Sequence, residues 1–156
     1  EGTNLSEGRG TTQPLEIFGH PKIDSYFFYE KHLKSVIKDS KLEGFKIRPI
    51  TFIPTFHKHM NIVCGGFQIH VTDKRKFMPW RVGQIMLREM YHYLGDDFEW
   101  LNPPYEYNYL QMPIDIINGT DVLRQWVEKK GSLDSLIQFE NLESYIEQST
   151  TIKIYS

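Results

Sequence analysis

Two segments with helical periodicity enclose two segments with extended character, and this order constrains the fold more than any other feature of the chain. Apolar residues recur at helical spacing over residues 24–40 and again over residues 79–95. Between them, residues 45–56 and 62–72 carry the apolar patterns of extended chain. A chain ordered in this way is expected to pack its helices against a small sheet, which is the α+β class.

Local signals support both helices and limit both extended segments. Asp24 is a candidate N-cap for the first helix, and Pro79 is well placed as the first residue of the second. Pro49 and Pro54 confine the first extended segment to a sheet edge or to irregular extended chain. Gly65 and Gly66 predict a bulge or a close backbone contact in the second extended segment.

The remaining segments complete one domain. Residues 97–117 are rich in aromatic residues and proline and are expected to form an ordered loop. Thr120 can cap a helix that runs to about residue 130, a helical region is expected over residues 132–149, and a short strand over residues 152–155. We therefore predict one compact α+β domain over residues 1–156, with a small mixed or antiparallel sheet and about four helices.

Composition excludes several classes of partner. The chain has 156 residues, of which 40% are hydrophobic, so it can bury one core. Its formal net charge of -2 and scattered basic residues argue against nucleic acid, which would require a basic stripe. The single cysteine, Cys64, allows neither an internal disulfide nor a thiolate metal site, and no apolar stretch approaches the roughly 18 residues of a membrane span. Membrane insertion of this domain is not expected.

Three clusters of residues can carry chemistry. Residues 1–12 combine carboxylates, an amide, a guanidinium and hydroxyls on a glycine-containing loop, which suits a polyhydroxylated ligand, although a solvated, mobile terminus is equally compatible. In an extended strand, His57 and His59 would share one face, as would Gln68 and His70; hydrogen-bonded structural histidines are the stronger interpretation, because no third zinc ligand is indicated.

The third cluster is aromatic. Trp100 is followed by two prolines and by Tyr105 and Tyr107, rings that can stack on the apolar face of a sugar. A loop that covers an edge of the core is the alternative, and it fits most of these rings.

Three strings in the sequence resemble successive signatures of a known family. They are EGTNLSEGRGTTQPLEIFGHP, RPITFIPTFHKHMNIVCGGFQIHVTD and FEWLNPPYEYNYLQMPIDIINGTDVLRQWV. In this order, across nearly the whole chain, they are similar to the NamZ-type exo-β-N-acetylmuramidases, long catalogued as a domain of unknown function. His57 departs from the family pattern, in which a serine stands before the lysine and histidine.

The resemblance implies a bacterial glycoside hydrolase that releases N-acetylmuramic acid from the non-reducing end of peptidoglycan fragments. It implies that this chain is the C-terminal domain of a two-domain protein whose N-terminal Rossmann-like domain supplies the catalytic glutamate, so we expect the chain alone to be inactive. Glu1 is the local candidate for a second catalytic carboxyl group, with Glu7 as the alternative. The residues expected to line or support the substrate cleft are Asn4, Ser6, Glu7, Arg9, Lys58, Gln68 and His70.

The resemblance also bears on the ligand. Arg9 or Lys58 can pair with the lactyl carboxylate that distinguishes muramic acid from glucosamine. The expected partners are muramyl glycosides derived from peptidoglycan and the Rossmann-like domain; no cofactor and no metal is expected. A secreted, periplasmic or lipid-anchored location is favoured over the cytoplasm. The alternatives are a non-catalytic domain that binds glycan or acts as a scaffold, and a metal-dependent hydrolase that uses His57, His59 and His70.

Overall fold

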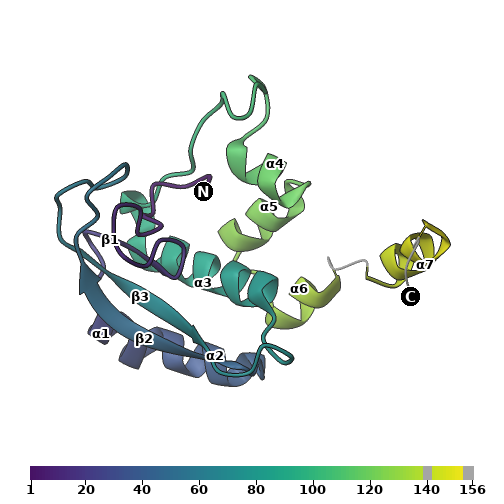
Figure 1. Ribbon diagram of the computed structural model, residues 1–156, viewed down its shortest axis with the longest axis horizontal. Helices are drawn as coiled ribbons and strands as arrows, with labels where there is room; N and C mark the ends of the chain where they lie inside the picture. The colour runs from purple at the N-terminus through teal and green to yellow at the C-terminus, as the bar shows by residue number, and fades with distance from the viewer. Residues whose placement is uncertain (139–141, 153–156) are drawn as a thin grey trace.

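A three-stranded antiparallel sheet lies at the centre of the fold in the computed structural model, which describes residues 1–138 and 142–152 (Figure 1). The strand order is β1-β3-β2, so β3 (Cys64–Val71) is central, flanked by β1 (Ile17–His20) and β2 (Phe45–Phe52). β2 is an edge strand, which confirms the prediction drawn from Pro49, since a proline cannot donate to the sheet. β1 is an additional strand that the sequence did not predict.

Glycines allow β1 and β3 to approach closely. Gly19 pairs with Gly66 in the antiparallel register. A side chain on Gly66 would collide with the carbonyl oxygen of Phe18 and would lie 2.8 Å from the Cα atom of Gly19. The predicted close backbone contact is therefore confirmed, and it explains why both positions lack a side chain.

The first helix covers residues 25–40 in three consecutive stretches, α1 (Ser25–Phe28), the π-helical η1 (Tyr29–Leu33) and α2 (Lys34–Ser40). Asp24 caps it, because its carboxylate accepts a hydrogen bond from the backbone N–H of Phe27 at 3.0 Å. The helix and its cap are confirmed as predicted.

The second helix, α3 (Pro79–Leu94), also matches its prediction, with Pro79 in the first turn and Gly95 as the C-cap. A short 3-10 turn, η2 (Gly95–Asp97), follows. The helix packs one apolar face against the sheet and the first helix, forming the main core. This core is built around Leu5, Ile23, Phe28, Leu33, Phe67, Val82, Met86, Met90, Leu94 and Phe98.

The carboxy-terminal third is helical, and the predictions for it need correction in detail. Within the predicted loop 97–117 the chain already forms α4 (Pro113–Asn118), because Pro113 is pre-organised for the first helical turn. The next helices are α5 (Val122–Glu128), α6 (Leu133–Gln138) and α7 (Leu142–Ile152). Thr120 is not the N-cap of α5 as predicted; that residue is Asp121, and the Thr120 hydroxyl, one position earlier, accepts from the N–H of Val122 at 3.2 Å.

The predicted strand 152–155 is not supported where it can be assessed. Ile152 is the last residue of α7, and residues 153–156 lie outside the described part of the chain. In Figure 1, α7 stands apart from the sheet and from α3.

The predicted class, α+β with a small antiparallel sheet, is confirmed. Counting residues 25–40 as one helix, the described residues form six helical segments rather than the expected four, because α4 was missed and the region 132–149 contains two helices. Among the residues described, no helix is both long enough and apolar enough to cross a bilayer.

Candidate functional site

The opening loop, residues 1–14, is built into the domain. Ser6 forms two backbone hydrogen bonds with Gly19 of β1, at 2.8 and 3.0 Å, and Thr3 forms a bridge with Trp100. Thr3, Leu5 and Ser6 are buried. The alternative of a solvated, mobile terminus is therefore wrong, and the polar side chains of this loop have fixed positions.

Four charged side chains meet on this loop. We refer to Glu1, Glu7, Arg9 and Lys58 as the charged cluster. Lys58 forms an ion pair with Glu7, and Arg9 forms one with Glu1. Arg9 also lies near Glu7, with 3.8 Å between the Arg9 Nε and Glu7 Oε2 atoms. Thr55 helps to hold the segment that carries Lys58, because its hydroxyl donates to the carbonyl of Gly10 at 2.5 Å.

The Glu7–Lys58 pair is shielded from solvent and keeps Glu7 ionised. The two side chains are 12% and 11% exposed. Burial alone would raise the pKa of the Glu7 carboxyl, but the hydrogen bond and positive charge of Lys58 oppose this, and the net pKa is lowered from 4.5. An ionised carboxylate accepts hydrogen bonds and stabilises positive charge, and it is a poor proton donor at neutral pH.

Two histidines and Asn4 fasten the same loop from the other side. His59 donates through Nε2 to the carbonyl of Asn4 at 2.7 Å, and its ring packs edge-on against His20, with 4.6 Å between ring centres. The Asn4 side chain donates to the carbonyl of Asp97 at 2.9 Å and accepts from the N–H of Glu99 at 3.1 Å. The role of this group is to hold the loop in place.

His20 is buried at the end of β1 and accepts from the N–H of Lys22 through Nδ1 at 3.2 Å. Burial, followed by the nearby His59, lowers the pKa of His20 below 6.5, and Lys22 acts in the same direction, whereas Asp97 opposes them. His20 is therefore neutral at neutral pH.

The histidines on the 54–63 segment do not share a strand face. β2 ends at Phe52, and both His57 and His59 have positive φ angles, 68° and 57°, so this stretch turns instead of continuing to residue 56 as expected. Across the described residues, no group of three or more His, Cys, Asp or Glu side chains is placed to hold a metal ion.

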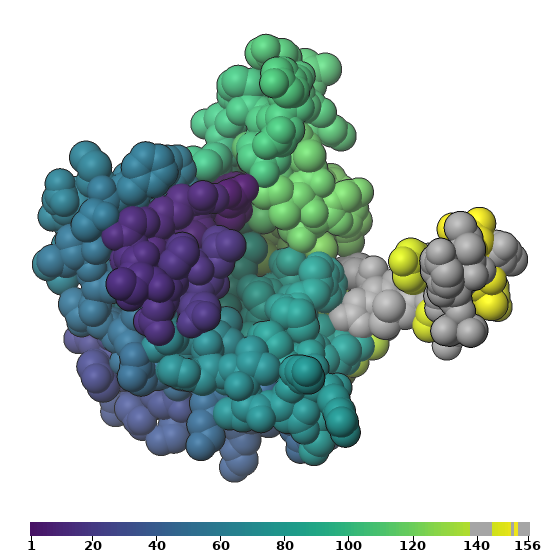
Figure 2. All heavy atoms as spheres, viewed as in Figure 1, coloured from purple at the N-terminus to yellow at the C-terminus, as the bar shows by residue number. Residues whose placement is uncertain are grey.

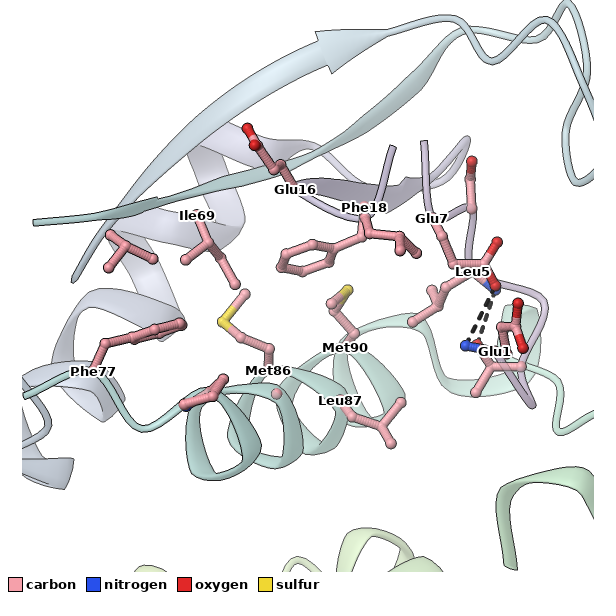
Figure 3. Close-up of a pocket in the computed structure, with 16 residues that line it drawn as sticks. Glu1, Leu5, Glu7, Glu16, Phe18, Ile69, Phe77, Met86, Leu87 and Met90 are labelled. Atoms are coloured by element: carbon pink, nitrogen blue, oxygen red, sulfur yellow. Dashed lines mark hydrogen bonds and ion pairs between the residues drawn. The ribbon is translucent and has the colours of Figure 1, made fainter. Parts of the chain in front are cut away.

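A cleft of about 480 Å³ opens beside the charged cluster. Its walls are the opening loop, β1, β3 and α3, and its floor is apolar (Figure 3). In this view Phe18 and Ile69 point from the sheet toward Met86 and Met90 of α3, while Glu1 and Glu7 lie at the far end. The cleft therefore joins an apolar chamber to the charged cluster.

The structure brings some of the predicted site residues together and separates others. The four members of the charged cluster lie in contact, and Glu1, Ser6 and Glu7 line the cleft. Gln68 is buried and accepts from Arg48 at 2.6 Å, and His70 is exposed. Because the alternate residues Ile69 and Val71 line the cleft, Gln68 and His70 lie on the other face of β3.

The aromatic cluster divides into two kinds of residue. Trp100 packs against Tyr91 and Phe98 beside the core, with ring centres 5.8 and 4.9 Å away. Tyr105 donates its hydroxyl hydrogen to Glu1 at 3.1 Å, and Tyr107 is exposed. Trp100 therefore covers an edge of the core, as in the alternative interpretation of this cluster. Tyr105 and Tyr107 can still reach a ligand.

Sequence reasoning missed His20 and the apolar floor of the cleft. His20 stands inside the first of the strings that carry the family resemblance, but nothing in its spacing marks it as a partner of His59. Met86 and Met90 read as ordinary core positions of an amphipathic helix, and only the fold shows that they also face a cleft.

Comparisons with known proteins give concordant results. Residues 1–155 match the model of a family described as "Exo-beta-N-acetylmuramidase NamZ, C-terminal". The chain is 34% identical over 137 residues to the peptidoglycan beta-N-acetylmuramidase NamZ of Bacillus subtilis (strain 168), covering 88% of this chain and 30% of that protein. It also resembles the crystal structure of a DUF1343 family protein from Bacteroides fragilis NCTC 9343, with a TM-score of 0.75, 16% identity, and coverage of 98% of this chain and 38% of the other. The chain thus spans about a third of the length of these relatives.

Proposed function

Because the chain belongs to the family of C-terminal domains of NamZ-type exo-β-N-acetylmuramidases, we propose that it forms one wall of the substrate cleft of a peptidoglycan glycosidase. The complete enzyme would release N-acetylmuramic acid from the non-reducing end of peptidoglycan fragments. We further propose that this chain is the second of two domains, that a Rossmann-like domain precedes it, and that the preceding domain contributes the main catalytic glutamate.

The charged cluster at the end of the cleft is the observation that carries this proposal. Glu1, Glu7 and Arg9 lie on the opening loop, which hydrogen bonds to the sheet, and Lys58 joins them from the 54–63 segment, which provides donors and acceptors in fixed positions for a hydroxylated ligand. Fixed polar groups lose little entropy on binding, so they suit specific recognition.

We assign roles within the cluster from the chemistry of each group. Glu1 is the proposed second catalytic carboxyl group, since glycoside cleavage commonly uses two. Glu7, kept ionised by Lys58, is a hydrogen-bond acceptor for the sugar. Arg9 is the proposed partner of the lactyl carboxylate, because its side chain is more exposed than that of Lys58 and its guanidinium can bind a second carboxylate.

Asn4 and Ser6 support the loop that presents these groups, and we propose both as residues that support substrate binding. We propose the same supporting role for Gln68 and His70, which lie on the face of β3 behind the cleft wall. The proposed ligand is a muramyl glycoside derived from peptidoglycan.

The decisive test is turnover by the full-length protein. We expect it to release free N-acetylmuramic acid from a muramyl-glucosamine disaccharide, detected by chromatography. Arg9→Gln should reduce kcat/KM by about tenfold or more, chiefly through KM, because a charge-assisted hydrogen bond is lost. Arg75→Gln, which alters an exposed arginine that does not line the cleft, is the matched control. No release of muramic acid by the unaltered full-length protein would contradict the proposal.

A second function, a non-catalytic domain that binds glycan or acts as a scaffold, is favoured by one observation: both carboxylates of the charged cluster are paired with cations, Glu1 with Arg9 and Glu7 with Lys58. Under this alternative, the chain would bind muramyl glycosides, and Glu1→Gln in the full-length protein would leave turnover unchanged. A strong loss of turnover in Glu1→Gln, with retained binding, would favour the catalytic role instead.

A further inference from the structure

A turn next to the charged cluster presents large apolar side chains to solvent. We refer to residues 105–111 as the tyrosine turn. Tyr107 and Leu110 are each 92% exposed and Tyr109 is 72% exposed. Single exposed apolar residues are common on protein surfaces, but three of them within four residues form a patch, and such a patch indicates a contact surface.

The tyrosine turn has a defined conformation despite this exposure. Tyr105 and Asn108 exchange two backbone hydrogen bonds, at 2.9 and 2.8 Å. The Asn108 side chain accepts from the N–H groups of Leu110 and Gln111, at 2.9 and 3.0 Å, and donates to the Gln111 side chain at 2.8 Å. Because the backbone is already ordered, little conformational entropy is lost when a ligand stacks on the tyrosine rings.

The tyrosine turn is connected to the cleft. The hydroxyl of Tyr105 donates to Glu1, and two residues before Pro103 the backbone N–H of Leu101 donates to the carbonyl of Gly2 at 2.9 Å. In Figure 2 the turn belongs to the green projection above the purple opening loop. A ligand that leaves the cleft past Glu1 would therefore meet this turn next.

The chemistry of the turn selects among possible partners. Glu106 is the one charged residue from position 101 to position 112, and the other polar groups are amides and phenol hydroxyls. Without a lysine or arginine, the turn does not suit nucleic acid or anionic lipid headgroups. Aromatic faces beside amide groups suit a sugar, whose C–H face stacks on a ring while its hydroxyls exchange hydrogen bonds.

We propose that the tyrosine turn binds the glycan strand beyond the disaccharide that is cleaved, and so makes this site selective for long strands. The inference rests on the proposed function, because it takes the cleft at Glu1 as the place where the terminal sugar is held. Tyr107 and Tyr109 are the stacking residues.

The test compares two substrates with the full-length protein. In the double variant Tyr107→Ala/Tyr109→Ala, kcat/KM for long peptidoglycan strands should fall by about tenfold, and kcat/KM for the muramyl-glucosamine disaccharide should stay within about twofold. Tyr107→Phe/Tyr109→Phe, which keeps both rings, should retain most of the activity on strands. Tyr26→Ala removes an exposed tyrosine from α1 and should leave kcat/KM unchanged for both substrates. Unchanged activity on strands, or equal losses on both substrates, would overturn the proposal.

Two further readouts separate the possible failures. If the unaltered protein cleaves neither substrate, the proposed function fails, and retention on insoluble peptidoglycan then tests the turn: binding lost in the alanine variant supports it, and equal binding overturns it. If the alanine variant lowers the unfolding midpoint of the full-length protein but not that of the 156-residue chain, the turn contacts another domain and the proposal is overturned.

Discussion

The ion pair of Glu7 and Lys58 ties the 54–63 segment to the opening loop, and both partners are nearly buried. Replacing one partner leaves the other charged and desolvated, so Lys58→Met should lower the free energy of unfolding by about 3 kcal/mol. Urea denaturation of the chain measures this. Lys34→Met removes an exposed partner of Glu30 and should cost less than about 0.5 kcal/mol.

The double variant Glu7→Gln/Lys58→Met distinguishes the charge from the packing. It should recover part of the stability lost in Lys58→Met, because no unpaired charge remains buried. If Lys58→Met and Lys34→Met have equal effects, the pair is exposed to water in solution and the cluster is less rigid than the structure indicates.

His20 makes stability depend on pH. Its pKa is lowered in the folded chain, so the unfolded chain takes up a proton first as the pH falls. The contribution of neutral His20 is complete above pH 6.5 and is lost as the pH falls through 6.5 toward the lowered folded pKa. We expect the unfolding free energy to decrease from pH 7 to pH 5, and His20→Gln to flatten that decrease.

The control for His20 is His70→Gln, which alters an exposed histidine of β3. If His70→Gln flattens the pH profile of the urea midpoint as much as His20→Gln does, the pH dependence is not specific to the buried His20. A profile that is the same in all three proteins would mean that His20 does not titrate differently on folding.

At the residue scale, the sequence identified the members of the charged cluster but not their pairing. Glu1, Glu7 and Arg9 could be chosen because they share one glycine-containing loop. Lys58 is 51 residues from Glu7, and no local pattern indicates which of two cations pairs with which of two carboxylates. His57 and His59 were given a strand geometry that left-handed turns exclude.

At the scale of elements, the approach of β1 to β3 depends on glycine. Gly66→Ala should lower the free energy of unfolding by about 3 kcal/mol, because the added methyl group meets the backbone of Phe18 and Gly19. Gly83→Ala is the opposite case: Gly83 lies within α3 with open space around it, so the variant should gain about 0.5–1 kcal/mol. Urea denaturation of both variants checks the pair. Equal destabilisation would refute the close packing of the strands.

The elements that could be predicted are those with local signals. The first helix has Asp24 as its cap, α3 begins at Pro79 and ends before Gly95, and both helices have apolar periodicity within their own sequence. β1 has four residues, one of them glycine, and exists because β3 lies beside it; no local pattern reports such a long-range pairing. α4 was missed because the prolines and aromatic residues around it are typical of a loop.

At the scale of the molecule, one apolar face organises most of the fold. The face of the sheet that carries Phe18, Phe67 and Ile69 packs against α3 and the first helix, and the cleft is the part of this layer that the helices leave open. The same packing that stabilises the domain therefore also shapes the apolar floor beside the charged cluster.

The second core cluster extends this unit through α5 to α6. Leu136 of α6 is fully buried and belongs to the cluster that contains Leu123, Trp126 and Val127. By contrast, Tyr145 and Ile146 of α7 are exposed, and α7 stands apart in Figure 1. We therefore expect α6 to unfold together with the rest of the domain, and we expect Tyr145 and Ile146 of α7 to add little to its stability.

Two substitutions locate this boundary. Leu136→Ala should lower the free energy of unfolding of the chain by about 3 kcal/mol, because it leaves a cavity among packed apolar side chains. Ile146→Ser should change it by less than about 0.5 kcal/mol, because the isoleucine is already in contact with water. Urea denaturation followed by circular dichroism measures both. A loss in Ile146→Ser as large as that in Leu136→Ala would show that α7 packs on the domain in solution, and the unit would then extend to residue 152.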